Sequence, residues 1–182
     1  MNRVANFVFI VCSNFIFVST LLLGSTKMAQ ASDSPSRKAN IHLVHSQEWA
    51  AFVTSNEPKS CFVVSMPQSK EPPYLSHGNV LFFVVTKPDE GISKEPSIQV
   101  EYPFKKGSDV LLEVDEIDFK LFARGNTAWL ETTKEEMKMI AAMKKGKKAV
   151  VRATSARGNN VKYEFSLMGV TSALNAAEKE CR

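Results

Sequence analysis

Three histidines and a cluster of acids are the residues whose chemistry suits catalysis or metal binding. His42 and His45 lie three residues apart on an expected strand, so their side chains point to opposite faces and do not converge on one metal ion. Asp115, Glu116 and Asp118 fit a solvated hairpin turn, where aspartate is favoured. The sequence contains no Gly-x-Ser-x-Gly elbow and no Cys-x-x-Cys pair. We therefore predict no catalytic residue, no metal site and no cofactor. An enzyme whose triad assembles only in space remains an alternative.

Five cationic residues form the strongest candidate for contact with an anionic partner. They are Lys144, Lys145, Lys147, Lys148 and Arg157. Such a group can bind phosphate, sulfate or anionic headgroups. The structural alternative is that lysines at a helix C-terminus stabilise the helix dipole without any ligand. The partner that these residues predict is an unidentified protein, a glycan, or an anionic envelope or host surface.

The polar segment Ser155–Asn160 (SARGNN) separates two runs of alternating apolar residues, Val150–Thr154 and Val161–Leu167. Strict alternation predicts two half-buried antiparallel strands. Glycine and asparagine tolerate the positive φ of a tight turn. We predict that this segment is first a hairpin turn and second a contact surface, since the turn itself does not require Arg157.

The cysteines predict one disulfide bond. Cys12 lies in the apolar N-terminal run, which leaves Cys61 and Cys181 as an even pair in the processed chain. Their bridge would close a loop worth about 4–5 kcal/mol in the chain-entropy estimate. The alternative is two unrelated thiols.

The N-terminus has the pattern of a secretory signal peptide. Arg3 opens it, an apolar run follows from Val4 to Gly24, and Ala29-Gln30-Ala31 is a cleavage site of the A-x-A type. We predict a signal peptide over residues 1–31, a flexible leader over 32–40 and a single domain over 41–182. An uncleaved membrane anchor is the alternative, because the apolar run is long enough to span a bilayer.

Composition and charge place the chain among globular proteins. Its 182 residues are 44% hydrophobic and 23% charged, with a formal net charge of +4. The predicted cleavage removes two of the basic residues, Arg3 and Lys27, and no acid. The remaining balance is only mildly basic, which disfavours a nucleic-acid partner.

The periodicity predicts many short strands and two helices. Strands are expected at Ile41–His45, Glu48–Thr54, Ser60–Met66, Val80–Lys87, Val110–Val114, Ile117–Leu121 and Thr127–Glu131, in addition to the two around Ser155–Asn160.

The segments Gln68–Gly78 and Pro88–Pro96 are expected to be loops. A helix is expected over Thr133–Lys145, with Thr133 and Glu136 as its capping box and Met137 and Ile140 on one face. A short terminal helix is expected over Thr171–Lys179. The aromatic side chains Trp49, Phe119, Phe122, Trp129 and Phe165 are expected in the core.

The C-terminal half carries seven short motifs in a fixed order. They are Phe-x-x-Gly at 104–107, a valine-rich hairpin, Phe-x-Leu-Phe at 119–122, Ala-Trp at 128–129, Ala-Met-x-x-Gly at 142–146, Ser-x-Arg-Gly at 155–158, and Phe-Ser-Leu-x-Gly at 165–169 followed by Ala173-Leu174. In this order they resemble the invasion-associated locus B family of exported bacterial proteins. The front half fits the family through Trp49 and Cys61-Phe62-Val63-Val64.

The resemblance implies an immunoglobulin-like antiparallel β-sandwich and export to the periplasm, the outer membrane or the medium of a Gram-negative bacterium. It also implies a link to host-cell invasion and no catalytic residue. We predict an exported, non-enzymatic envelope or surface protein associated with invasion. The alternatives are a periplasmic housekeeping or stress protein that binds envelope components, and an unrecognised enzyme.

Overall fold

The computed structural model describes residues 40–55 and 57–182 of the chain. The predicted signal peptide, residues 1–31, lies outside this range, and so does the predicted leader except for Asn40. Both remain predictions. No helix within the described residues is long and apolar enough to cross a membrane.

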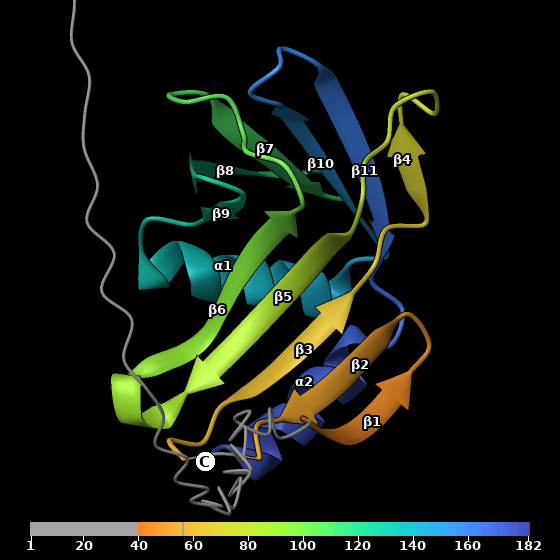
Figure 1. Cartoon of the computed structure of the whole chain (residues 1–182). Helices are drawn as coiled ribbons and strands as arrows, with labels where there is room; N and C mark the ends of the chain where they lie inside the picture. The colour runs from red at the N-terminus through yellow and green to blue at the C-terminus, as the bar shows by residue number, and fades with distance from the viewer. Residues whose placement is uncertain (1–39, 56) are drawn as a thin grey trace, which may run out of the picture. The chain divides into compact units, whose positions relative to one another are not determined.

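In the described part of the chain, eleven strands pair edge to edge in one antiparallel sheet that curls over its own core (Figure 1). The strands are β1 (Ile41–Ser46), β2 (Trp49–Val53), β3 (Cys61–Ser65), β4 (Ser69–Glu71), β5 (Val80–Lys87), β6 (Ile92–Val100), β7 (Asp109–Val114), β8 (Ile117–Arg124), β9 (Thr127–Trp129), β10 (Lys148–Thr154) and β11 (Asn160–Ser166). Their order across the sheet is β1-β2-β3-β5-β6-β9-β8-β7-β10-β11-β4.

The short strand β9 joins the two halves of the sheet. It pairs with β6 on one side, through Ser97 and Trp129, and with β8 on the other, through Phe122 and Trp129. The prediction of antiparallel β structure is confirmed. The immunoglobulin-like sandwich of two separate sheets is not confirmed, because the hydrogen-bonded ladder continues through β9 from one half to the other.

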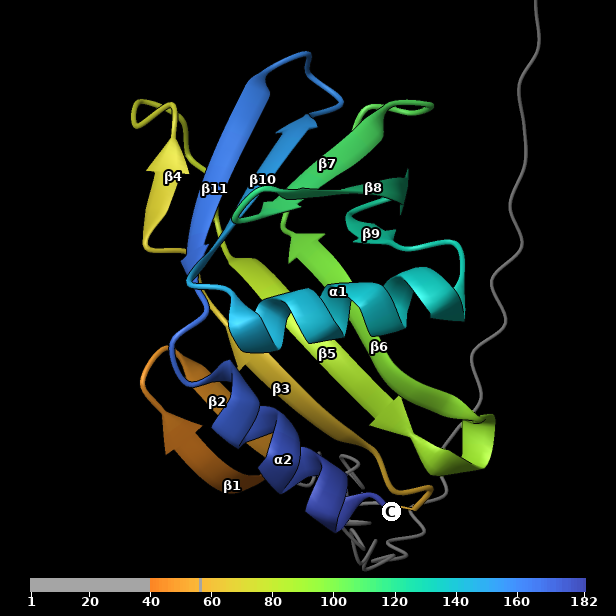
Figure 2. The ribbon, with the colours of Figure 1, turned by 180° about the vertical axis from the view of Figure 1, so that it is seen from behind.

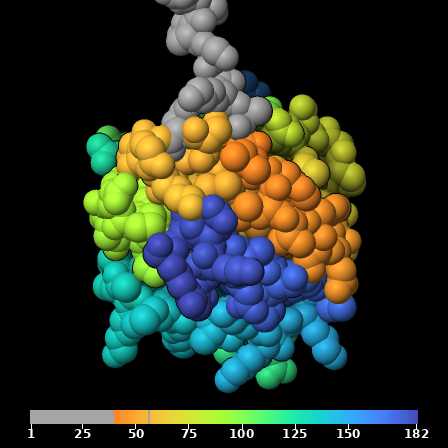
Figure 3. All heavy atoms as spheres, turned by 90° about the horizontal axis from the view of Figure 1, so that it is seen from below, coloured from red at the N-terminus to blue at the C-terminus, as the bar shows by residue number. Residues whose placement is uncertain are grey.

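Two helices within the described residues pack on the inner face of the sheet. Helix α1 (Thr133–Lys145) contacts β6, β7 and β8, whereas α2 (Val170–Glu180) contacts β1, β2 and β3. Figure 2, the view from behind, shows α1 crossing in front of β5 and β6, and α2 lying in front of β2. Seen from below, α2 lies at the surface between the β1–β2 hairpin and α1 (Figure 3). Both helices were predicted, and their ends agree to within a residue.

The start of α1 differs from the predicted capping box by one residue. Thr132 caps the helix, since its hydroxyl accepts a hydrogen bond from the backbone N–H of Glu135 at 3.3 Å and donates to the Glu135 carboxylate at 3.0 Å. The predicted helix face was right for Ile140 and wrong for Met137, which is 63% exposed. The helix buries Met139, Ile140, Ala142 and Met143.

The core lies between the curled sheet and the helices. Its largest fully buried side chains include Trp49, Tyr163, Phe82 and Phe165. The rings of Phe82 and Phe165 meet edge to face at 5.5 Å between centroids, linking β5 to β11 across the core. The expected burial of Trp49, Phe119 and Phe165 is confirmed.

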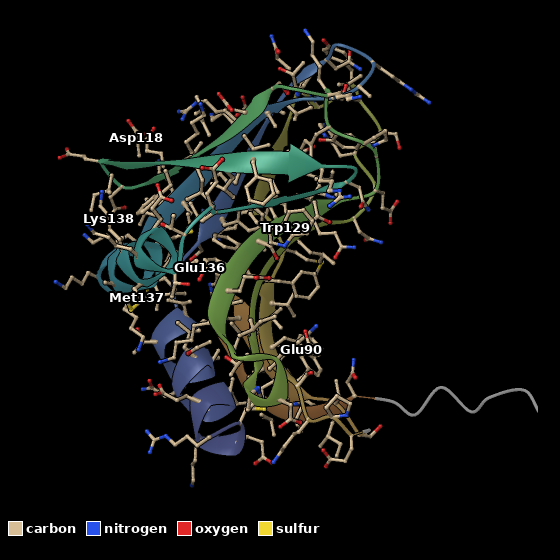
Figure 4. The ribbon with its side chains drawn as sticks, turned by 90° about the vertical axis from the view of Figure 1, so that its left-hand side faces the viewer. Glu90, Asp118, Trp129, Glu136, Met137 and Lys138 are labelled. Atoms are coloured by element: carbon tan, nitrogen blue, oxygen red, sulfur yellow. A yellow bond between two sulfur atoms is a disulfide. The ribbon has the colours of Figure 1, made fainter. Side chains whose placement is uncertain are left out.

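Two aromatic residues expected in the core lie on the outer face of the sheet. Trp129 is only partly buried and Phe122 is 40% exposed, and their rings lie 5.7 Å apart. Figure 4 shows Trp129 well apart from Glu136, Met137 and Lys138 of α1. In β9 the residue that points inward is Ala128, so the alternation along a strand turns Trp129 outward.

Strands β4 and β6 fall where loops were expected. Pro96 in β6 was the misleading residue, because proline is disfavoured inside a sheet. Here Pro96 pairs with Val84 of β5, and the pairing of β6 with β9 begins only at Ser97. Pro96 therefore lies just outside the stretch of β6 that pairs with β9, so its missing N–H removes no hydrogen bond between β6 and β9. The segment before β6 forms a 3-10 helix, η1 (Pro88–Glu90), as part of the predicted loop.

The disulfide between Cys61 and Cys181 is present, as predicted. It joins the start of β3 to the residue that follows α2, over a sequence separation of 120. The bridge therefore fixes the C-terminal helix against the sheet.

Candidate functional site

The predicted hairpin turn is confirmed in detail. Strands β10 and β11 pair from Lys148–Ser166 to Thr154–Asn160. Within the turn, the N–H of Ser155 donates to the carbonyl of Asn159 at 2.9 Å, and the Asn159 N–H donates to the Ser155 hydroxyl at 3.1 Å. Gly158 has φ of +85°. Turn geometry thus explains Gly158 without a ligand. The prediction of positive φ was wrong for Asn159 and Asn160, and Asn160 instead accepts a hydrogen bond from the Thr154 hydroxyl at 3.1 Å.

The same turn is also one wall of a cavity of about 550 Å³, which we call the hairpin-tip cavity. Two other segments complete it: Leu75–Gly78 in the loop before β5, and Glu101–Pro103 after β6. The turn is fixed against the second of these, because the N–H of Ala156 donates to the carbonyl of Pro103 at 2.9 Å. Three loops from different parts of the chain therefore meet at this end of the sheet, the upper end in Figure 1.

A hydrogen-bonded relay of His77, Tyr163 and Tyr102 lies beside the cavity. Nδ1 of His77 lies 3.0 Å from the Tyr163 hydroxyl oxygen, and Nε2 lies 3.0 Å from the carbonyl oxygen of Pro72. The Tyr163 and Tyr102 hydroxyls hydrogen-bond to each other. His77 and Tyr163 are buried, whereas Tyr102 is partly exposed and, with His77, lines the cavity.

When the His77 ring carries one proton, the carbonyl at the end of the relay sets the donor in each hydrogen bond. A carbonyl only accepts, so Nε2 of His77 holds that proton and Nδ1 accepts from Tyr163. Tyr163 has used its one proton, so the Tyr102 hydroxyl donates to the Tyr163 oxygen. The Tyr102 oxygen therefore offers the cavity only acceptor capacity.

Burial keeps both phenols protonated. It raises the pKa of Tyr163 far above its ordinary value, and the hydrogen bond with Tyr102 raises it further. Burial also raises the pKa of Tyr102, although the hydrogen bond to Tyr163 partly offsets this. Neither hydroxyl therefore ionises near neutral pH.

One cation and one anion stand at the rim of the cavity. Arg157 is exposed, lines the cavity and forms no ion pair with any residue in the described range. Glu101 also lines it and accepts a hydrogen bond from the side-chain amide of Asn79. Leu75, Pro103 and Val161 add apolar surface. The cavity thus combines opposite charges with an apolar wall and an acceptor-only hydroxyl.

The structure does not bring the five predicted cationic residues together. Lys148 begins β10, whereas Arg157 lies in the turn beyond Thr154 at its other end. Seven residues at the rise of a strand separate the two ends by roughly 20 Å. The lysines form one group at the C-terminus of α1, and Arg157 belongs to the hairpin-tip cavity.

Structural contacts hold the segment that carries these lysines. The Asp115 carboxylate accepts hydrogen bonds from the backbone N–H groups of Lys147 and Lys148 at 3.2 Å each. The Lys148 side chain lies 3.8 Å from Glu164. The side chains of Lys144, Lys145 and Lys147 remain exposed.

A second hollow, of about 650 Å³, lies on the outer face of β7, β10 and β11. Its surroundings carry a ladder of cross-strand ion pairs: Asp109–Lys120, Glu113–Arg152, Lys148–Glu164 and Glu71–Lys162. Arg152 and Lys162, the two cations that line it, are already paired, so the hollow presents fewer free charges than the hairpin-tip cavity.

Sequence reasoning found Arg157 but missed the residues opposite it. Tyr102 and His77 lie 61 and 86 residues before Tyr163, and no motif links them. The alternation of Val161, Tyr163 and Phe165 correctly placed Tyr163 inside the sheet. It gave no signal for the relay, because the partners come from loops.

Comparison with known proteins decides the family. A family model described as "Invasion associated locus B (IalB) protein" matches residues 49–178. The chain belongs to the IalB family. The resemblance predicted from the seven motifs is therefore confirmed.

Among solved structures, the crystal structure of invasion associated protein B from Bartonella henselae is similar to this IalB-family chain. The likeness has a TM-score of 0.56 and 18% sequence identity, and covers 79% of this chain and 98% of that chain. At this identity it establishes a shared fold. A search of curated proteins found no match.

Proposed function

We propose that this IalB-family chain works after export, in the cell envelope or at the cell surface, and contributes to host-cell invasion by binding rather than by catalysis. Family membership supports the association with invasion. The hairpin-tip cavity, in which Arg157, Glu101 and Tyr102 line a single hollow, is the observation that carries the binding role.

The hydrogen bonds around the cavity favour binding over catalysis. A general base must have a free lone pair within reach of the proton that it removes. Both ring nitrogens of His77 are engaged, and the hydroxyl of Ser155 accepts from Asn159. The groups that would serve as base and nucleophile instead hold the cavity in shape.

Two features support export. The apolar run and the A-x-A site at Ala29–Ala31 match a signal peptide, so we propose a mature chain that begins at Ser32. The Cys61–Cys181 bridge suits an oxidising compartment such as the periplasm or the medium. The intact mass of the exported protein tests this, and a product that retains residues before Gly24 would contradict it.

The invasion role is tested by complementation. A strain that lacks the gene should invade cultured host cells less than its parent. Wild type and Lys134→Glu should restore invasion, whereas Arg157→Glu should restore it less. Lys134 is the matched control, because it is an exposed cation in the first turn of α1, where a glutamate favours the helix dipole.

Two measurements distinguish the proposal from the alternatives. Protease added to intact cells should cleave a surface protein and spare a periplasmic one. Unchanged invasion in the deletion strain, together with an envelope defect, would instead favour the housekeeping role.

A further inference from the structure

We propose that the hairpin-tip cavity binds an amino-acid-like zwitterion, with its ammonium group on Tyr102 and Glu101 and its carboxylate on Arg157. This inference rests on the proposed binding function and adds the chemical class of the ligand. The source can be a free amino acid, or an amino acid held on a polymer with its amino and carboxyl groups free.

The relay determines the first requirement. With one proton on the His77 ring, His77 donates to the Pro72 carbonyl, Tyr163 donates to His77 and Tyr102 donates to Tyr163, so the Tyr102 oxygen can only accept from a ligand. A ligand that presents a carboxylate or phosphate to this oxygen would bring two acceptors together. A ligand that presents an ammonium or hydroxyl group satisfies it.

The rim charges determine the second requirement. Glu101 disfavours a purely anionic ligand, and Arg157 disfavours a purely cationic one, because like charges repel across a small hollow. Arg157 has no carboxylate partner among the described residues, and a guanidinium binds carboxylates in a bidentate manner. A zwitterion matches both charges at once.

Size and the apolar wall determine the third requirement. A hollow of about 550 Å³ lies within the usual range for small-molecule sites. Leu75, Pro103 and Val161 provide contact for an aliphatic side chain. Leucine is therefore a suitable probe, since it carries both charges and a branched apolar body.

The test is calorimetric titration of the purified, disulfide-bonded exported protein with leucine and two singly charged analogues. 4-Methylpentanoate lacks the ammonium group, and 3-methylbutylamine lacks the carboxylate. Leucine should bind at least about ten-fold more tightly than either, the effect of losing one charge-assisted hydrogen bond. Equal affinity for the three probes, or no binding of leucine, would overturn the proposal.

Variants assign the two ends of the ligand. Tyr102→Phe should weaken leucine binding while leaving 4-methylpentanoate nearly unchanged, because only the ammonium loses its acceptor. Arg157→Gln should weaken leucine and 4-methylpentanoate together, and Lys134→Gln should change neither. Equal leucine binding by Arg157→Gln and wild type would also overturn the assignment, and this exposed position carries no risk to folding.

O-Phosphoethanolamine separates this ligand class from a lipid headgroup of similar charge. Tighter binding of this probe than of leucine would overturn the amino-acid assignment. The outcome is independent of the proposed function: if leucine fails to bind while Arg157→Glu still lowers invasion, the ligand class is wrong and the binding role stands.

Discussion

The indole N–H of Trp49 donates a hydrogen bond to the backbone carbonyl of Ser166, 117 residues further along the chain, at 2.9 Å. The Glu48 N–H donates to the carbonyl of Met168 at 3.3 Å, and the next residue, Gly169, packs against Ser46. The β1–β2 turn therefore lies directly on the joint between β11 and α2. This contact connects one edge of the sheet to the strand that forms a wall of the hairpin-tip cavity.

Gly169→Ala should destabilise the protein strongly. Gly169 has φ of +94°, and an added Cβ would lie 1.9 Å from the carbonyl oxygen of Ser46. Backbone strain and a clash with backbone should together cost about 3 kcal/mol or more. Gly125→Ala is the control, because φ is +63° there and nothing lies within 4 Å of its Cβ position. Its cost should be about 1–2 kcal/mol in urea denaturation. Similar costs at both sites would contradict the close contact with Ser46.

The sequence predicts most of the local secondary structure but little of the order in which the strands pair. Alternation of apolar residues predicts the hairpins, periodicity and capping residues predict both helices, and the cysteine count predicts the disulfide. The sequence predicts a strand over Thr127–Glu131 with Trp129 in the core, whereas β9 has only three residues and buries Ala128 in place of Trp129. The continuity of the sheet through β9 depends on pairing between strands that are distant in sequence, which no local pattern records.

The candidate site illustrates the same division. Arg157 stands out in the sequence because turn chemistry does not need it. Its position opposite Tyr102 and Glu101 follows only from the folded contact between Ala156 and Pro103. The lysines are close to Arg157 in sequence. In the structure, however, they lie at the start of β10, and Arg157 lies in the turn beyond the other end of that strand.

Phe165→Ala should cost about 3–5 kcal/mol in the free energy of unfolding, because it leaves a cavity in the core. Phe165 is fully buried and contacts Phe82. The matched control is Phe122→Ala, since Phe122 is 40% exposed on the outer face. Denaturant melts should show a clearly smaller loss for the control. A loss below about 1 kcal/mol for Phe165→Ala would mean that its ring is not part of the core.

Cys181→Ser should lower the free energy of unfolding by up to about 4–5 kcal/mol, the chain-entropy estimate for a loop of this size. The bridge spans a sequence separation of 120 and holds the end of α2 on β3. The loss should appear in denaturant melts under non-reducing conditions. The unfolded wild type should show no titratable thiol before reduction, and two reactive thiols at that stage would contradict the bridge.

Glu136 should make the protein less stable as pH rises. Burial raises the pKa of this carboxyl above its ordinary value of 4.5, and the neighbouring Glu95 raises it further, although a hydrogen bond with Thr133 opposes both. The folded state therefore binds this proton more tightly than the unfolded state, so the free energy of unfolding falls as pH rises through the range just above 4.5.

The comparison between wild type and Glu136→Gln isolates this effect. The variant should gain stability relative to wild type as pH rises from 4 to 7. Glu116→Gln, at an exposed turn, is the control for a change in net charge. A difference between wild type and Glu136→Gln that stays constant across this range would contradict the raised pKa.

The separation of Arg157 from the lysines predicts that two charge reversals act independently. If the exposed lysines at the C-terminus of α1 bind an anionic polymer, Lys147→Glu should weaken binding to heparin, and the effect should shrink as salt rises. Arg157→Glu should leave heparin binding nearly unchanged, because roughly 20 Å of β10 is about twice the screening length of 8–10 Å.

Leucine binding should respond to Arg157→Glu and not to Lys147→Glu. Heparin chromatography over a salt series and calorimetry with leucine measure the two effects. Equal losses of heparin binding from both variants would show that the two ends act as one surface, and no heparin binding at low salt would leave the lysines with only their structural role at the end of α1.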